Sequence, residues 1–194
     1  MKRNLAWHFV NEKLRDGSPV PKDGVWLEYK GPLVLCESGL HWSRTPFDAL
    51  QYAPGNTLCL VEIGGEIVEK NGDDKGISSR RKIIVRMEAE ELLRYFARMQ
   101  ALSVIHLNED LPEIVCNYLM TGDEAIRDAA WAAARDAAMA SAWDAAGDAA
   151  MDAAMDAARA AARDAAMDAA GDAARAAAKE HFNQLVYECF EDWL

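Results

Sequence analysis

The residues of this chain that could do chemistry are its histidines, one basic cluster and a column of aspartates. The four histidines, His8, His41, His106 and His181, fall in separate predicted elements and lack the short spacings of metal ligands. We therefore expect no metal site. The basic cluster, Arg80-Arg81-Lys82, is compatible with an anion site, but we interpret it as the solvated entrance to a strand.

Two further motifs lack the partners that their chemistry needs. His41 is followed by Ser43, but no acid is placed to complete a hydrolytic triad. Gly64-Gly65 lacks the third glycine and the following helix of a phosphate-binding turn. The motifs by themselves predict no reaction.

An acidic column recurs at four-residue steps within an alanine-rich stretch from Thr121 to Glu180. It consists of Asp136, Asp144, Asp148, Asp152, Asp156, Asp164, Asp168 and Asp172. Alanine is the best helix former, and no proline interrupts the stretch, so we predict helix throughout. The uninterrupted ladder of Asp144, Asp148, Asp152 and Asp156 places one charge about every 6 Å of helix. Two interpretations stay open: a solvated face paired with nearby arginines, or a surface that recognises a basic partner.

Duplex DNA carries one charge per ~1.7 Å of its axis, so a single helix of this kind is too sparse to imitate DNA. Mimicry would need several helices or a dimer. The column before the aspartates holds the large side chains, including Trp131 and Trp143. These two tryptophans are predicted packing contacts and candidate binding residues.

Gly147 and Gly171 are the positions at which we expect the helical stretch to break or kink. Each stands in an Asp-Ala-Ala-Gly block and is followed by an aspartate, which suits a helix end and a new N-cap. The predicted helices cover about 124–146, 148–170 and 172–193. The alternative is one continuous helix over 124–180.

The charge of −11 is concentrated in the C-terminal part of the chain. Residues 1–120 hold 15 basic and 17 acidic residues, 121–180 hold 6 and 12, and 181–194 add three acids. This balance argues against direct binding to nucleic acids or anionic membranes and suits a basic protein partner. The widely spaced cysteines, and the lack of a signal peptide or a ~20-residue apolar span, predict a cytoplasmic protein with reduced thiols.

The first 120 residues show short strand patterns and three helix patterns, which predict a mixed α and β domain. The expected strands cover 6–10, 25–29, 33–36, 58–63, 66–68 and 82–85, and the expected helices cover 46–53, 88–99 and 111–120. Thr45 is the predicted N-cap of the first helix, with Pro46 at its first position. The predicted fold is therefore α+β: a domain over 1–120, then an all-α, alanine-rich four-residue-repeat module over 121–194.

An amphipathic helix ends the chain. Its apolar face is formed by Phe182, Leu185, Val186, Cys189, Phe190 and Trp193. This face is the largest apolar anchor of the C-terminal module, so we expect it to dock against the N-terminal domain or a second copy. If it docks nowhere, Phe182, Phe190 and Trp193 form a free binding surface.

Three segments resemble known proteins. Ser-Gly-Leu-His-Trp-Ser over 38–43, Pro-Phe-Asp-Ala-Leu-Gln-Tyr-Ala over 46–53 and the strand 58–63 resemble uncharacterised bacteriophage and prophage proteins with alanine-rich repeats. More remotely, their order is similar to the core of ADP-ribosyltransferases. That resemblance implies an NAD site in which His8 is the early histidine, His41 replaces a tyrosine and Arg81 replaces a glutamate. An arginine there would repel the developing positive charge of the transfer reaction.

The leading hypothesis is a cytoplasmic, phage-type interaction protein without catalysis or a cofactor. It would bind a host protein and inhibit a nucleic-acid-handling or defence complex through its acidic helical surface. The alternative is an enzyme of the mono-ADP-ribosyltransferase type, with NAD as its cosubstrate. A second alternative is a structural protein that oligomerises through its helices.

Overall fold

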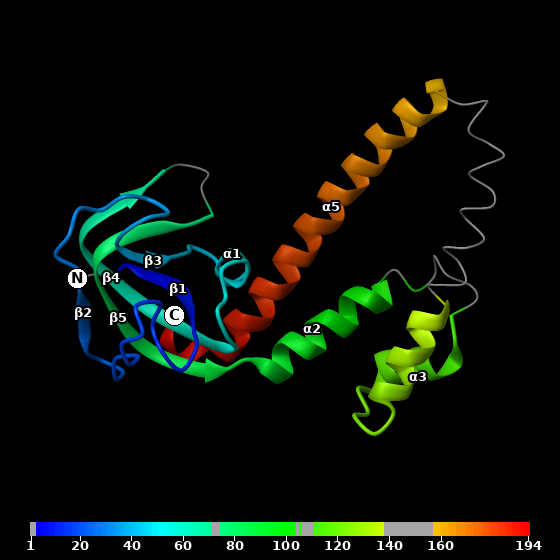
Figure 1. Cartoon of the computed structure of the whole chain (residues 1–194), viewed down its shortest axis with the longest axis horizontal. Helices are drawn as coiled ribbons and strands as arrows, with labels where there is room; N and C mark the ends of the chain where they lie inside the picture. Colours follow the sequence, from blue (N-terminus) through cyan, green and yellow to red (C-terminus); the bar gives the residue numbers. More distant parts are fainter. Residues whose placement is uncertain (1–2, 71–73, 104, 106–110, 138–156) are drawn as a thin grey trace. The chain divides into compact units, whose positions relative to one another are not determined.

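The chain folds as an α+β protein, with an N-terminal antiparallel sheet and a short helix followed by further helices (Figure 1). The computed structural model describes residues 3–70, 74–103, 105, 111–137 and 157–194, with the side chains of 157–170 excepted. The chain forms two compact units, Met1–Leu92 with Lys179–Leu194, and Leu93–Ala178. We call the first the sheet unit. The predicted domains 1–120 and 121–194 stay a prediction, because compactness does not test independent folding.

Five antiparallel strands form the sheet. They are β1 (Leu5–Val10), β2 (Trp26–Glu28), β3 (Leu40–Trp42), β4 (Thr57–Glu69) and β5 (Gly76–Glu88). The order is β1-β4-β5-β2, and β3 also pairs with β5, at the start of that strand and before the segment that pairs with β2. The chain after β3 then returns to β1, since Trp7 and Ser43 exchange backbone hydrogen bonds of 2.8 and 2.9 Å. The sheet therefore curls toward a closed ring.

Strand β4 is one bent strand where the sequence predicts a hairpin of two. Its register against β5 shifts between Gly64 and Ile67. Gly65 has φ of 71°, and a Cβ there would lie 2.1 Å from the hydroxyl of Ser79. The two glycines thus form a bulge that bends the strand. The hairpin turn predicted between 58–63 and 66–68 is wrong.

The strand predicted over 33–36 is also wrong. These residues form a tight turn in which Val34 pairs with Ser38, and Cys36 adopts a positive φ of 73°. The hydroxyl of Ser38 donates a 2.5 Å hydrogen bond to the carbonyl of Pro32. A local turn therefore replaces the hairpin that the apolar run suggested.

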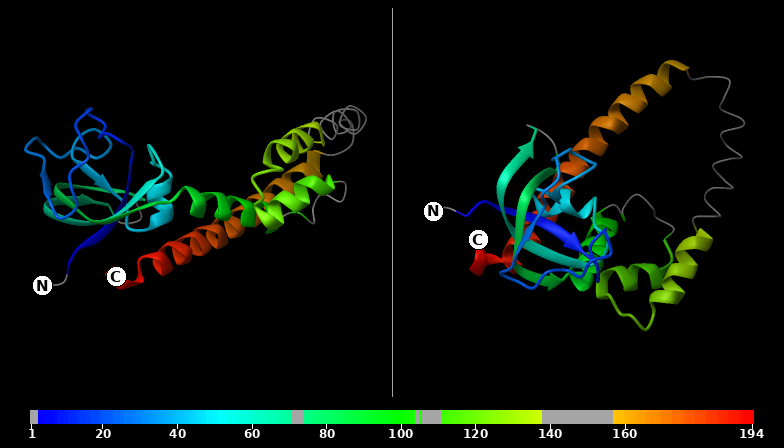
Figure 2. Two further views of the ribbon diagram at one scale, coloured as in Figure 1. Left: turned by 90° about the horizontal axis from the view of Figure 1, so that it is seen from below. Right: turned by 60° about the vertical axis from the view of Figure 1, so that its left-hand side comes forward.

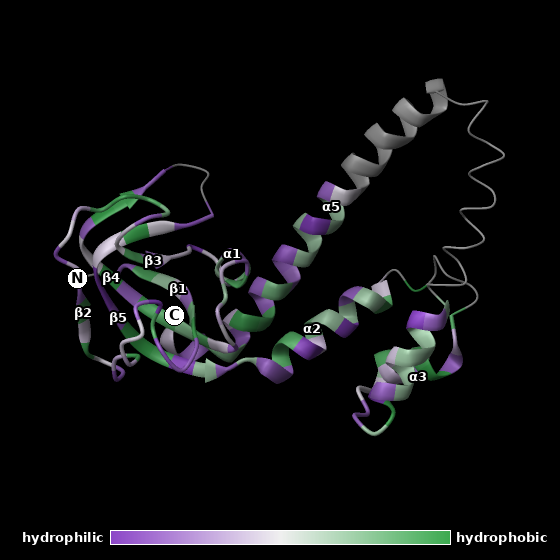
Figure 3. Ribbon diagram, in the orientation of Figure 1, coloured by the Kyte–Doolittle hydropathy of each residue, from purple (hydrophilic) through white to green (hydrophobic). Residues whose placement is uncertain are grey.

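The inner face of the curled sheet forms the core of the sheet unit. It contains the buried residues Ala6, Val10, Trp42, Cys59, Val61, Ile63 and Ile83. Figure 3 shows hydrophobic residues along the strands in green. Trp7 pairs with Leu60 and Phe9 with Leu58, and side chains alternate along a strand, so these four lie on the outer face.

The C-terminal end of helix α5 (Ala157–Cys189) covers this outer face, as the red segment in Figures 1 and 2 shows. Phe182 and Val186 are fully buried, and the ring of Phe190 lies 5.0 Å from that of Trp7, edge to face. The predicted docking of the C-terminal helix against the N-terminal domain is confirmed for Phe182, Val186 and Phe190, whereas Cys189 and Trp193 of the predicted face are exposed. A 3-10 helix, η2 (Glu191–Trp193), follows.

Polar contacts join the same helix to α1 (Pro46–Leu50). The amide of Phe47 donates a 2.9 Å hydrogen bond to the side chain of Asn183, and Lys179 pairs with both oxygens of Asp48 at 2.7 and 2.9 Å. Thr45 caps α1 as predicted, accepting from the amide of Asp48. Because α1 ends at Leu50, it is shorter than the helix predicted over 46–53.

Helix α5 continues through Gly171, so the break predicted there is wrong. One glycine inside a helix costs only about 1 kcal/mol, which its alanine-rich neighbours offset. Gly147, the other predicted break, lies outside the described residues.

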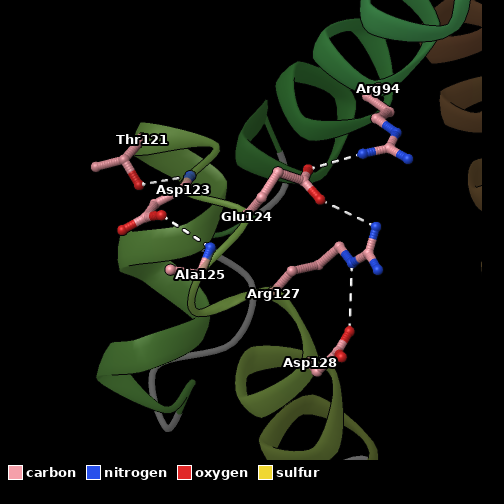
Figure 4. A network of polar contacts seen from close by, with 7 residues as sticks. All are labelled: Arg94, Thr121, Asp123, Glu124, Ala125, Arg127 and Asp128. Carbon is pink, nitrogen blue, oxygen red and sulfur yellow. Dashed lines mark hydrogen bonds and ion pairs between the residues drawn. The ribbon is translucent and has the colours of Figure 1, made fainter.

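The second unit is largely helical in the part that the structure describes. It contains most of α2 (Glu90–Ser103), α3 (Glu113–Thr121), a helical stretch over 127–137 and the residues of α5 up to Ala178. Glu124 bridges Arg94 at 2.9 Å and Arg127 at 3.0 Å (Figure 4). Such exposed pairs contribute little individually. Within the described part of the chain, no helix is both long and apolar enough to cross a membrane.

Candidate functional site

His8, His41 and Arg81, which stand far apart in the sequence, come together on the curled sheet. They belong to β1, β3 and β5 respectively. Arg81 donates a short hydrogen bond from Nη1 to the backbone carbonyl of His41. Arg81 and His41 both lie close enough to His8 to lower the pKa of its imidazole. We call these three residues the buried polar cluster.

The strand register places Arg81 in the interior. It pairs with Ile63 on one side and with Leu27 on the other, and directly opposed side chains share a face. Ile63 and Ile83 belong to the inner core, so Arg81 points inward with them and is 7% exposed. The interpretation of this residue as part of a solvated strand entrance is wrong.

The two neighbours of Arg81 in the basic cluster point the other way. Arg80 and Lys82 each lie 4.6 Å from the ring of Trp26. Arg80 also pairs with Glu28 at 3.2 Å, and Lys82 with Glu62 at 2.6 Å. The period of two along β5 therefore divides one basic run into two paired surface cations and one buried cation.

Both histidines of the cluster are neutral at pH 7. The pKa of His8 lies well below 6.5, mainly because the imidazole is buried, and further because Arg81 and His41 repel a proton. The pKa of His41 is lowered by burial first, then by Arg81, Lys75 and Arg15. Neutral imidazoles can donate and accept one hydrogen bond each, but they do not balance the charge of Arg81.

Arg81 has no acidic partner among the described residues. Burial lowers its pKa to about 10, and the only opposing influence comes from Cys59. Burial raises the pKa of the Cys59 thiol to about 11, so this group is also neutral at pH 7. The cluster is thus a buried cation surrounded by neutral polar groups.

A small cavity lies beside Arg81. Its volume is about 10 Å³, and apart from Arg81 its lining is apolar: Val10, Leu14, Pro21, Val25, Leu27 and Ile83. This volume suits one water-sized particle. Pockets for ligands such as nucleotides are far larger, so this cavity does not hold NAD.

A larger and more open cleft of about 640 Å³ lies at the end of β1. It is lined by Val10, Asn11, Glu12, Pro19, Val20, Gly55, Asn56, Thr57, Arg86 and Glu88. The charged groups at one side are already engaged, because Arg86 binds Asp23 and Glu88 accepts from the hydroxyl of Thr57. Of the charged lining residues, Arg86 and Glu88 are thus engaged, and the polar residues Asn11, Glu12 and Asn56 also line the cleft.

The binding residues predicted from the helical repeat are only partly described. Asp144, Asp148, Asp152, Asp156 and Trp143 lie outside the described residues. Trp131 is 70% exposed in the second unit. Phe182 and Phe190 are buried in the sheet unit, whereas Trp193 is 49% exposed. Their role in binding a partner stays a prediction.

Sequence reasoning missed two features of the site: the position of Cys59 beside the cluster and the burial of Arg81. The pattern Arg81-Lys82-Ile83 could have indicated this burial, because Ile83 is a core residue on the same face of the strand. The contacts of Lys179 and Asn183 with α1 had no sequence signal, since 131 and 136 positions separate the partners. Among the described residues, no group of three or more His, Cys, Asp or Glu side chains could hold a metal ion.

The fold and the cluster together define an α+β protein whose curled antiparallel sheet encloses a buried arginine. Residues 4–95 match the model of a domain of unknown function, DUF7666. The match covers the sheet and α1 but stops before the C-terminal helix. The chain matches no curated protein and no solved structure. None of these comparisons links it to phage proteins or to ADP-ribosyltransferases.

Proposed function

We propose that the chain is a non-catalytic interaction protein, in which the sheet unit anchors an acidic, alanine-rich helix that binds a basic partner protein. The observation that carries this proposal is the exposure of α5 over 171–177. All seven of these residues are exposed, although Phe182 in the same helix is fully buried. Seven residues make almost two turns, so the helix has free surface on every side.

The alanine content of this segment favours helix. Most helices in proteins are stabilised further by packing of an apolar face, which these turns lack. The exposed turns carry alanine, Asp172 and Arg175, and no large apolar side chain. A partner that packs against the small side chains would stabilise them, and the net charge of −6 over 121–180 favours a basic surface.

The buried polar cluster supports a role without catalysis. Transfer of ADP-ribose needs a carboxylate that stabilises positive charge, and Arg81 supplies the opposite charge. The cavity beside it is about 10 Å³ and does not admit a nucleotide. The finer form of the proposal is a cytoplasmic, phage-type protein that inhibits a nucleic-acid-handling or defence complex of its host.

Capture of a partner from host-cell lysate tests this function. The tagged full-length chain should retain one specific protein at ordinary salt and release it at high salt. Replacement of Asp144, Asp148, Asp152 and Asp156 by Asn should abolish capture while helicity, measured by circular dichroism, stays unchanged.

The matched control removes the same number of charges from the sheet unit. Its substitutions, all at exposed positions, are Glu12→Gln, Glu37→Gln, Glu66→Gln and Glu91→Gln. This variant should still capture the partner. Unchanged capture by the ladder variant at ordinary salt would exclude recognition through the acidic ladder.

One observation favours a second candidate, an enzyme of the ADP-ribosyltransferase type: His8, His41 and Arg81 do come together. Because the cluster has no carboxylate among the described residues, we expect no turnover of labelled NAD and no transfer of label to lysate proteins. Robust transfer that disappears in His8→Ala would establish the enzyme and overturn the proposal of a non-catalytic protein.

A further inference from the structure

We propose that the small cavity beside Arg81 binds a single small inorganic anion, of which chloride is the most abundant. The site lies between β2, β5 and the chain that follows β1. It belongs to the sheet unit alone, so it does not depend on the proposed partner binding.

Arg81 is a buried cation without a counter-charge among the described residues. A buried cation is costly unless an opposite charge accompanies it. Arg81 is 7% exposed, and three nearby acids are engaged elsewhere: Glu28 with Arg80, Glu62 with Lys82 and Asp23 with Arg86. An anion in the cavity would provide the counter-charge that the described residues lack.

The hydrogen-bond donors of Arg81 are only partly used by the described residues. A guanidinium group has five N–H donors, and one nitrogen of Arg81 binds the carbonyl of His41. No described residue accepts from its Nε or Nη2. These donors need an acceptor, and the cavity is the adjoining space that Arg81 lines.

The size and the lining of the cavity select the class of ligand. A volume of about 10 Å³ admits one water-sized particle, not a nucleotide or a carboxylate-bearing metabolite. A buried water is held by two to four polar partners, whereas Arg81 is the only polar side chain here. A monatomic anion only accepts hydrogen bonds, which matches a guanidinium that only donates them, and it also balances the charge.

The test uses the full-length chain in two measurements. In the first, thermal unfolding is followed while sodium chloride replaces sodium gluconate at constant ionic strength, because gluconate is too large for the cavity. We expect the melting temperature to rise with chloride. Well above half-saturation, each tenfold increase should lower the unfolding equilibrium constant about tenfold. In the second, the ³⁵Cl resonance should show excess line width that saturates and is displaced by bromide.

Two variants assign the effect to Arg81. Arg81→Met should abolish both the chloride dependence and the excess line width. Arg80→Met, at the adjacent position on the opposite face, should keep both, because Arg80 pairs with Glu28.

Equal melting temperatures in chloride and gluconate, together with no saturable line width in the wild-type chain, would overturn the proposal even if Arg81→Met does not fold. Retention of the chloride dependence in a folded Arg81→Met variant would also overturn it.

Discussion

At the scale of single residues, the neutral imidazole of His8 makes folding sensitive to pH. The pKa of His8 in the folded chain lies well below its ordinary value of 6.5, chiefly through burial and then through repulsion by Arg81 and His41. Between these two pKa values the unfolded chain therefore binds more protons than the folded chain. By linkage, the contribution of His8 to the free energy of unfolding is fully present above pH 6.5 and is lost as the pH drops below it.

We predict that the wild-type chain loses stability from pH 6.5 downward, by up to about 1.4 kcal/mol per pH unit for His8 alone. His8→Gln, which cannot take up the proton, should show a shallower dependence in urea denaturation across this range. His181→Gln, which lies outside the buried polar cluster, serves as the control and should keep the wild-type slope. An equal slope in His8→Gln and the wild type would contradict the assignment.

For single residues, the sequence predicted only part of the candidate site. The sequence grouped His8, His41 and Arg81 only through its remote resemblance to ADP-ribosyltransferases, and the three residues do lie together in the structure. The burial of Arg81 was missed because a run of three basic residues suggests solvent. The register against Ile63 and Leu27 shows that the middle residue faces inward.

At the scale of elements, periodicity predicted most helices, but the breaks were governed by local backbone chemistry. The apolar runs at 58–63 and 66–68 suggested a hairpin, whereas Gly64 and Gly65 form a bulge within one strand. Conversely, Gly171 suggested the end of a helix, but α5 passes through it. A glycine permits a turn without requiring one, and the residues around it determine whether the chain turns there.

Gly171→Ala distinguishes these two roles of glycine. In a continuous helix the alanine should stabilise by up to about 1 kcal/mol and raise helicity, because no atom lies within 4 Å of the added Cβ. At a left-handed helix end the same change would destabilise. Circular dichroism and thermal unfolding of the full chain give the answer. Lower helicity in Gly171→Ala than in the wild type would instead support a helix that ends at Gly171.

The docking of the C-terminal helix gives a second test at this scale. Phe182 is fully buried, and its ring lies 6.1 Å from that of Phe47. Phe182→Ala should lower the free energy of unfolding by about 3–5 kcal/mol, as is typical of a large buried aromatic residue. Glu188→Gln, at an exposed position of the same helix, should change it little. Urea denaturation monitored by tryptophan fluorescence measures both, and a small effect of Phe182→Ala would place this helix away from the sheet.

At the scale of the whole molecule, the sheet unit is assembled from both ends of the chain. The family match ends at residue 95, but the outer face of the sheet around Trp7 is covered by residues after Lys179. The amphipathic pattern predicted that the C-terminal face docks. It could not select the sheet over a second copy, because an apolar helical face fits either surface.

The last prediction follows from this assembly. Residues 1–92 alone would expose Trp7, Phe9, Leu58 and Leu60 on the outer face, and would leave the α1 amide of Phe47 without Asn183. We expect this fragment to aggregate or to lack a cooperative unfolding transition. A separate peptide of residues 179–194 should restore the transition and bind with saturable anisotropy, because it carries the buried Phe182, Val186 and Phe190. A peptide with these three residues replaced by serine should do neither. If residues 1–92 alone melt at the temperature of the full chain, the C-terminal helix is not part of the folded core.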